Sequence, residues 1–105
     1  MATPTKIGQR GEQSVARNLK RNGFQVELSP GSLGASDLKA SKPRKNWFVQ
    51  VKTSQGPQPA WPSPREIVRL KAAATKANAT PVVAQVSGNS PPEYRSAKNR
   101  RRLEP

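Results

Sequence analysis

Apolar and polar positions along the chain change their period several times, and each change marks a predicted element. Residues 5–22 carry apolar side chains three and four positions apart, which predicts a helix, and Gly23 supplies a typical stop. The segment FQVEL, residues 24–28, alternates apolar with polar and predicts a strand with one buried face. Two further strands are predicted at residues 37–40 and 47–53, joined by the basic turn SKPRKN.

A second helix and a fourth strand follow a proline-rich loop. In the sequence SPRE, Ser63 can cap a helix, Pro64 suits its first turn and Glu66 completes a capping box. This helix is predicted to run to about residue 78, and TPVVAQVS, residues 80–87, is predicted as a strand. The order is α-β-β-β-α-β, which predicts an α/β domain with a mixed sheet and helices packed on it.

The remainder of the chain differs in composition. Residues 88–105 are polar, interrupted by prolines and basic, and we expect them to form a mobile tail attached to a domain of residues 1–87.

Charge points to the class of partner. The 105 residues include 19 Lys and Arg against 6 Asp and Glu, a net charge of +13, and the usual partner of such an excess is a phosphate backbone. No apolar run reaches the roughly 20 residues of a membrane span, and no signal-peptide pattern opens the chain, so a cytoplasmic protein is expected. With no cysteine and no histidine, disulfides, thiolate zinc sites and Ser-His or Cys-His catalysis are excluded.

Carboxylates, amides, hydroxyls and lysine remain as candidate chemistry. Glu12 falls inside the apolar stripe of the first helix, where it either reaches past the stripe to water or serves a function. Gln50 and Lys52 lie two apart on a strand and share a face, which is either a solvated face or half of a site.

Strand pairing brings in the single aspartate of the chain. If Ala40 lies opposite Trp47 in a simple hairpin, Asp37 lies opposite Gln50 and shares its face. A register shift of one residue would move Asp37 to the opposite face from Gln50 and Lys52. The apolar pattern independently favours the register that keeps all three on one face.

These residues suit a hard divalent cation and a phosphodiester substrate. Mg²⁺ takes oxygen ligands and keeps several waters beside one or two carboxylates, so Asp37, Glu12, the Gln50 side-chain oxygen and the Val51 carbonyl are the candidate ligands. Mn²⁺ is expected to substitute for Mg²⁺. Lys52 would orient or deprotonate an attacking water, or offset the charge of the transition state.

The sequence resembles the PD-(D/E)XK nuclease superfamily, and within it the archaeal Holliday junction resolvases. The resemblance covers about residues 7–86 and is carried by GQRGE, by NGF before the first strand, by PGSLGASDL and by VQVKTS. It implies a restriction-endonuclease-like fold, metal binding by Glu12 and Asp37, a catalytic role for Lys52 and assistance from Ser32. Gln50 replaces the second carboxylate of the family, and the C-terminal portion is shorter than in the family.

Other basic and aromatic residues are candidate DNA contacts. Ser32 and Trp61 lie in predicted loops. Apart from the role implied by the resemblance, Ser32 would be an ordinary turn residue. Trp61 either stacks on a base or covers the core. The predicted DNA-binding set is Arg44, Lys45, Trp61, Arg95, Arg100, Arg101 and Arg102.

The prediction is therefore a Mg²⁺-dependent DNA endonuclease, active on branched DNA in recombination and repair, and a homodimer or higher homo-oligomer. A sequence-specific endonuclease of the restriction or homing type is one alternative. A non-catalytic DNA-binding module on the same fold is another, and a basic ribosomal or chromatin-like protein is a third.

Overall fold

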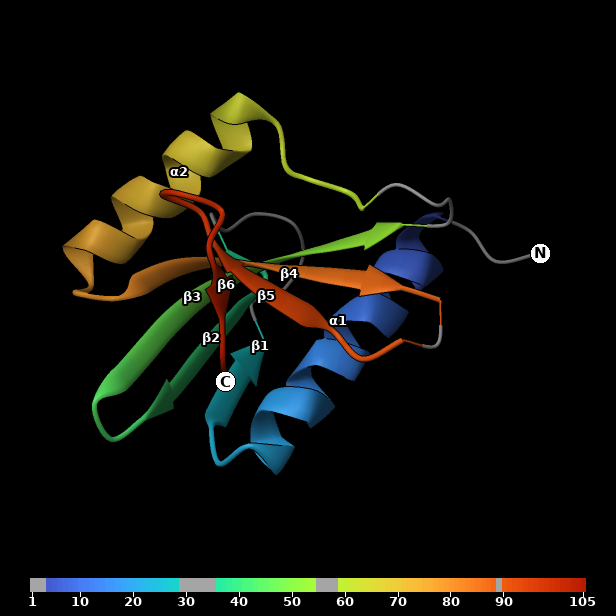
Figure 1. Ribbon diagram of the computed structural model, residues 1–105, viewed down its shortest axis with the longest axis horizontal. Coiled ribbons are helices and arrows are strands. Elements are labelled where there is room, and N and C mark those ends of the chain that lie inside the picture. The colour runs from blue at the N-terminus through green and yellow to red at the C-terminus, as the bar shows by residue number, and fades with distance from the viewer. Residues whose placement is uncertain (1–3, 29–35, 55–58, 89) are drawn as a thin grey trace.

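Two helices cover opposite faces of a mixed sheet in the computed structural model, which describes residues 4–28, 36–54, 59–88 and 90–105. Helix α1 (Pro4–Arg21) lies on one face and helix α2 (Pro64–Lys76) on the other (Figure 1). The six strands follow one another across the sheet in chain order, as β1 (Gln25–Leu28), β2 (Leu38–Lys42), β3 (Lys45–Ser54), β4 (Thr80–Ser87), β5 (Glu93–Ser96) and β6 (Arg102–Leu103).

The β2–β3 hairpin has the predicted register. Ala40 lies opposite Trp47, and Leu38 lies opposite Val49. All four of these residues are buried on the face covered by α1. Because side chains alternate along a strand, the residues between them face α2 or solvent, so the parity predicted from the apolar pattern is confirmed.

Strands β3 and β4 run parallel and are connected by α2, since parallel neighbours require a crossover. The helix begins with the predicted capping box. The Ser63 hydroxyl accepts a hydrogen bond from the Glu66 N–H at 3.3 Å, and the Glu66 carboxylate accepts one from the Ser63 N–H at 3.2 Å. This reciprocal pair satisfies two backbone donors at the start of the helix and fixes the Glu66 side chain there.

The hydrophobic core consists of two layers separated by the sheet. The larger layer lies under α1 and includes three aromatic rings in series, with 5.0 Å between the centroids of Phe24 and Trp47 and 5.6 Å between those of Trp47 and Tyr94. The smaller layer lies under α2 and joins Leu70, Val83 and Ala97.

The C-terminal segment differs from the prediction. Residues 88–105 were expected to form a mobile tail, but β5 pairs with β4 and β6 pairs with β5. Tyr94 is 2% exposed, and its hydroxyl donates a hydrogen bond to Asn18 Oδ1 of α1 at 2.8 Å. The expectation of a tail was wrong because residues 93–97 pair with the edge of β4 and bury Tyr94, Ser96 and Ala97. Within the described residues, no helix has the length and apolarity needed to cross a membrane.

Candidate active site

Asp37 lies where β2 separates from β3. Its backbone N–H donates to the Val49 carbonyl at 2.9 Å, and its Oδ2 accepts a hydrogen bond from the Val51 N–H at 2.8 Å. The regular pairing of the two strands begins only at the next residue, Leu38, opposite Val49. A side-chain carboxylate therefore replaces the next backbone acceptor of the ladder, and this holds Asp37 against the segment that carries Gln50 and Lys52.

Gln50 and Lys52 meet a third residue that the sequence analysis assigned only to helix capping. Glu66 Oε2 lies 2.8 Å from Gln50 Nε2 and 2.8 Å from Lys52 Nζ. The side chains of Lys52 and Glu66 are 29% and 36% exposed, so the ion pair is partly open to water. The predicted proximity of Gln50 and Lys52 is confirmed, and it is mediated by a carboxylate from α2.

Glu12 approaches the same end of β3 from the other face of the sheet. It is half-buried, and the preceding Gly11 is buried against β3. A Cβ atom at Gly11 would overlap Thr53 Oγ1 and would lie 3.4 Å from Val51 Cγ1. Helix α1 can contact the strand this closely only because residue 11 has no side chain, and the contact places Glu12 beside the end of the strand.

The two acidic side chains expected to bind a cation both have raised pKa values. Burial, and secondarily the charge of Asp37, raise the pKa of Glu12 above its ordinary value. Burial also raises the pKa of Asp37, and the Val51 N–H and the Lys52 ammonium oppose this increase only in part. A site that desolvates negative charge and places two such groups near each other has the electrostatic character of a cation site.

The donor set fits a hard divalent cation. Among the described residues no three acidic side chains gather closely enough to hold a metal ion on their own, so amide or carbonyl oxygen and water would have to complete the coordination. Mg²⁺ commonly binds in this way, with one or two carboxylates and several waters. Asp37, Glu12, the Gln50 amide oxygen and the Val51 carbonyl could hold such an ion.

Several predicted residues lie elsewhere. Ser32 is outside the described residues. Arg44 is exposed in the β2–β3 turn, and Lys45 follows it, with its Nζ donating to the Glu104 carbonyl at 3.0 Å. Lys45 and Lys52 are seven residues apart on β3, roughly 23 Å at about 3.3 Å per residue. The turn is therefore at the opposite end of the strand from the candidate site.

The basic residues of the C-terminal strands are partly engaged with other groups. Arg95 forms an ion pair with Glu93 at 3.0 Å, and Arg102 lies 4.0 Å from the same carboxylate. Arg101 is exposed.

Trp61 packs against the core layer under α2, as one of its two predicted roles requires. The ring is half-buried, and the guanidinium of Arg100 lies over it, 4.5 Å from the centroid. A base could stack on this face of the ring only by displacing Arg100.

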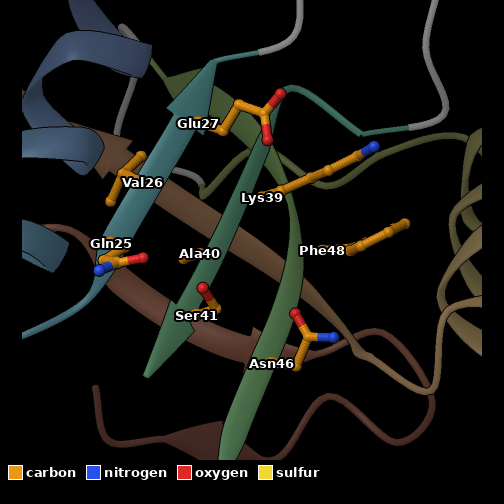
Figure 2. A pocket seen from close by; sticks show the side chains of 8 residues that line it. All are labelled: Gln25, Val26, Glu27, Lys39, Ala40, Ser41, Asn46 and Phe48. Carbon is orange, nitrogen blue, oxygen red and sulfur yellow. The ribbon is translucent and has the colours of Figure 1, made fainter. Parts of the chain in front are cut away.

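A shallow groove marks the part of the sheet that α2 leaves uncovered. It has a volume of about 330 Å³ and is bordered by β1, β2 and β3 (Figure 2). Glu27 and Lys39 project from neighbouring strands at its upper part, and Lys39 Nζ lies 5.2 Å from the centroid of the Phe48 ring. None of the candidate catalytic side chains lines this groove, which is therefore separate from the candidate site.

Comparison with solved structures decides the fold. Hjc, a Holliday junction resolvase from the archaeal hyperthermophile Archaeoglobus fulgidus, superimposes with a TM-score of 0.78 over 86% of this chain and 77% of that chain. The chain has a resolvase-like fold. Sequence identity to Hjc is 21%, and neither a protein-family model nor a curated protein sequence matches the chain. The predicted restriction-endonuclease-like α/β fold is confirmed, and the likeness concerns the fold alone.

Proposed function

We propose that this protein is a divalent-metal-dependent DNA endonuclease that cuts branched DNA. The observation that carries the proposal is that Asp37 lies beside Gln50 and Lys52 at one end of β3. The Asp37 carboxylate accepts a hydrogen bond from the N–H of Val51, the residue between Gln50 and Lys52 on that strand. The net charge of +13 supports a polyanionic substrate. The resolvase-like fold supports a nuclease and favours a branched substrate over a specific sequence.

Each candidate residue has a distinct role in the proposed hydrolysis of a phosphodiester. Water adds to phosphorus, one P–O bond breaks, and the leaving oxygen takes a proton, so the products are a phosphate monoester and a hydroxyl group. A divalent cation, when bound, would supply charge neutralisation and a more acidic water. Asp37 and Glu12 provide negative charge at the cation position, and Gln50 provides a neutral oxygen ligand. Lys52 orients the attacking water and offsets the charge that develops on the phosphate oxygens.

Two active sites are needed to cut both strands of a branched duplex. We therefore include a homodimer in the proposal, in keeping with the expectation from sequence. Sedimentation of the purified protein with and without a four-way junction measures the number of chains per complex.

The test of activity uses a panel of labelled DNA substrates. A four-way junction, a flap, a plain duplex and a single strand are incubated with Mg²⁺, with Mn²⁺ and with chelator. We expect cleavage of the branched substrates with either metal and none with chelator. Lys52→Ala and Asp37→Asn should abolish cleavage while DNA affinity changes little. If both variants cut DNA as well as the wild-type protein, the proposed function is wrong.

A further inference from the structure

Glu66 connects the N-terminus of α2 to the two polar side chains of β3 in the candidate site. One oxygen, Oε1, accepts the hydrogen bond from the Ser63 N–H, and the other, Oε2, contacts Gln50 and Lys52. Within the described part of the chain, Glu66 is the only acidic residue in an ion pair with Lys52. Each carboxylate oxygen of Glu66 thus has a defined partner, and the partner of Oε1 is the backbone N–H of Ser63.

We propose that Glu66 is a positioning residue of the nuclease site: from α2 it supplies the negative charge that Gln50 lacks on β3, and it fixes both Gln50 and Lys52. This inference rests on the proposed function. It gives Glu66 a role in addition to its role in the capping box.

The hydrogen bond to Glu66 determines which atom of Gln50 faces a cation. An ionised carboxylate only accepts hydrogen bonds, so Gln50 must turn its NH₂ group toward Glu66. The amide oxygen of Gln50 is then left for a cation. Without Glu66 the amide could rotate by half a turn and present its NH₂ group, which repels a cation.

The ion pair with Glu66 makes the position of Lys52 compatible with a cation nearby. An uncompensated ammonium beside Asp37 would compete with a divalent ion for the same carboxylate. Glu66 offsets this charge, and the capping box holds its side chain at a helix N-terminus, where the helix dipole also favours an anion. An exposed ion pair adds little to folding stability, so its main effect is expected in the geometry and charge of the site.

Charge arithmetic gives the direction of the effect. Asp37 lies within electrostatic reach of Glu12, Lys52 and Glu66, and these four groups together carry a net charge of −2 when all of them are ionised. Without Glu66 the net charge is −1. At distances of several ångströms and an effective dielectric constant of about 20, the loss of one unit charge should weaken binding of a divalent ion by roughly tenfold or more.

A reciprocal exchange tests the proposal. Glu66→Gln keeps the capping box, because glutamine also serves at that position, but it turns an NH₂ group toward the NH₂ group of Gln50 and the ammonium of Lys52. Gln50 would then rotate to turn its amide oxygen toward these two donors, which leaves its NH₂ group at the cation position. Combining Glu66→Gln with Gln50→Glu reverses the pair, since the carboxylate at position 50 can accept from both neighbours. Gln50→Glu alone brings two carboxylates into contact, and one of them should take up a proton, so the net charge of the site and its affinity for a cation should not rise.

Isothermal titration of the full-length chain with Mg²⁺ and single-turnover cleavage of a four-way junction are the two measurements. For Glu66→Gln we expect at least a tenfold loss in both, and for the double variant a return to within about threefold of wild type. Glu104→Gln removes one negative charge at the opposite end of β3 and should change neither Mg²⁺ affinity nor cleavage. Urea denaturation checks that each variant is folded.

The outcomes separate this inference from the proposed function. If Asp37→Asn abolishes cleavage but Glu66→Gln binds Mg²⁺ like the wild type, Glu66 has only its capping role. The inference also fails if the double variant is folded but binds Mg²⁺ no better than Glu66→Gln. If Glu66→Gln does not fold, the double variant alone decides, because it retains the pairing and must match the wild type. If the wild-type protein binds Mg²⁺ and cuts none of the substrates, the proposed function fails, and the Mg²⁺ titrations still test the role of Glu66.

Discussion

Replacement of Gly11 by alanine should disturb the candidate site through the packing of α1. An unhindered alanine would stabilise a helix interior by about 1 kcal/mol relative to glycine. At this position the added methyl group overlaps Thr53 Oγ1, a buried atom for which no hydrogen-bond partner is present in the described structure. Overpacking of this kind costs about 1 to 3 kcal/mol. We therefore expect a net destabilisation of roughly 1 kcal/mol instead of a gain.

The overlap predicts which second substitution restores stability. Thr53→Ala removes the overlapping oxygen, so the pair Gly11→Ala with Thr53→Ala should recover about 1 to 3 kcal/mol relative to the sum of the single changes. Thr53→Val puts a methyl group where the hydroxyl was and keeps the branched shape, so the overlap remains and Thr53→Val should not rescue Gly11→Ala. Urea denaturation of the wild type, the three single variants and the two double variants measures these free energies of unfolding.

Activity should respond more strongly than stability. A shift of α1 away from β3 moves Glu12 relative to Asp37, and small misplacements in an active site commonly cost about a hundredfold in rate. We expect single-turnover cleavage by Gly11→Ala to fall at least tenfold in protein that is fully folded. If Gly11→Ala instead raises stability by about 1 kcal/mol, leaves cleavage unchanged and combines additively with Thr53→Ala, the close contact between α1 and β3 is wrong.

Two further predictions concern the C-terminal strands and the pH dependence of the site. Tyr94→Phe removes the hydrogen bond to Asn18 and should lower the free energy of unfolding by about 1 kcal/mol. Tyr94→Ala also removes the buried ring and should lower it by about 3 to 5 kcal/mol. A loss below about 1 kcal/mol for the alanine variant would mean that β5 is not part of the core. Burial raises the pKa of Asp37, so the folded state binds the proton of this carboxyl group more tightly than the unfolded state does. The free energy of unfolding of the wild type should therefore fall as pH rises from about 3.8, the ordinary pKa, through the raised pKa of the folded state. Asp37→Asn should remove that loss and be more stable than the wild type at pH 7 without metal, in thermal denaturation followed from pH 3 to pH 8. Mg²⁺ should reverse the order by stabilising the wild type alone, and a variant that stays less stable at every pH would contradict the assignment.

The sequence was sufficient for the parts of the fold that have a regular pattern. Alternation of apolar and polar residues in β2 and in residues 49–52 of β3 indicated their register, because a shift of one residue would have moved Leu38 and Val49 out of the core. The start of α2 could be predicted because a capping box is a local signal, complete within four residues.

The parts that sequence reasoning missed depend on contacts between distant segments. Strand β5 carries one large apolar residue, Tyr94, between charged neighbours, and follows two prolines, so its composition is that of a tail. It becomes a strand because β4 offers an unpaired edge and Trp47 offers a partner for the ring. The only local signal was the alternation in EYRS, which is too short to predict a strand by itself.

Glu66 was missed for a related reason. The motif from Ser63 to Glu66 is by itself a sufficient reason for a glutamate at position 66, so nothing in the sequence indicated a second role. Its proximity to Lys52 arises only when α2 crosses from the end of β3 to the start of β4 and returns over the sheet. A carboxylate can thus be absent at position 50 of the strand and still be present in the same region of space.

The far end of β3 sets the orientation of the site as well. Trp47 is held between the rings of Phe24 and Tyr94 and is 4% exposed, so this residue cannot turn to the other face of the sheet. Because side chains alternate along a strand, fixing Trp47 on the α1 face also fixes Gln50 and Lys52 on the α2 face, where Glu66 lies. Strand β5, which supplies Tyr94, therefore contributes to the placement of Lys52, and loss of Tyr94 should weaken the site together with the core.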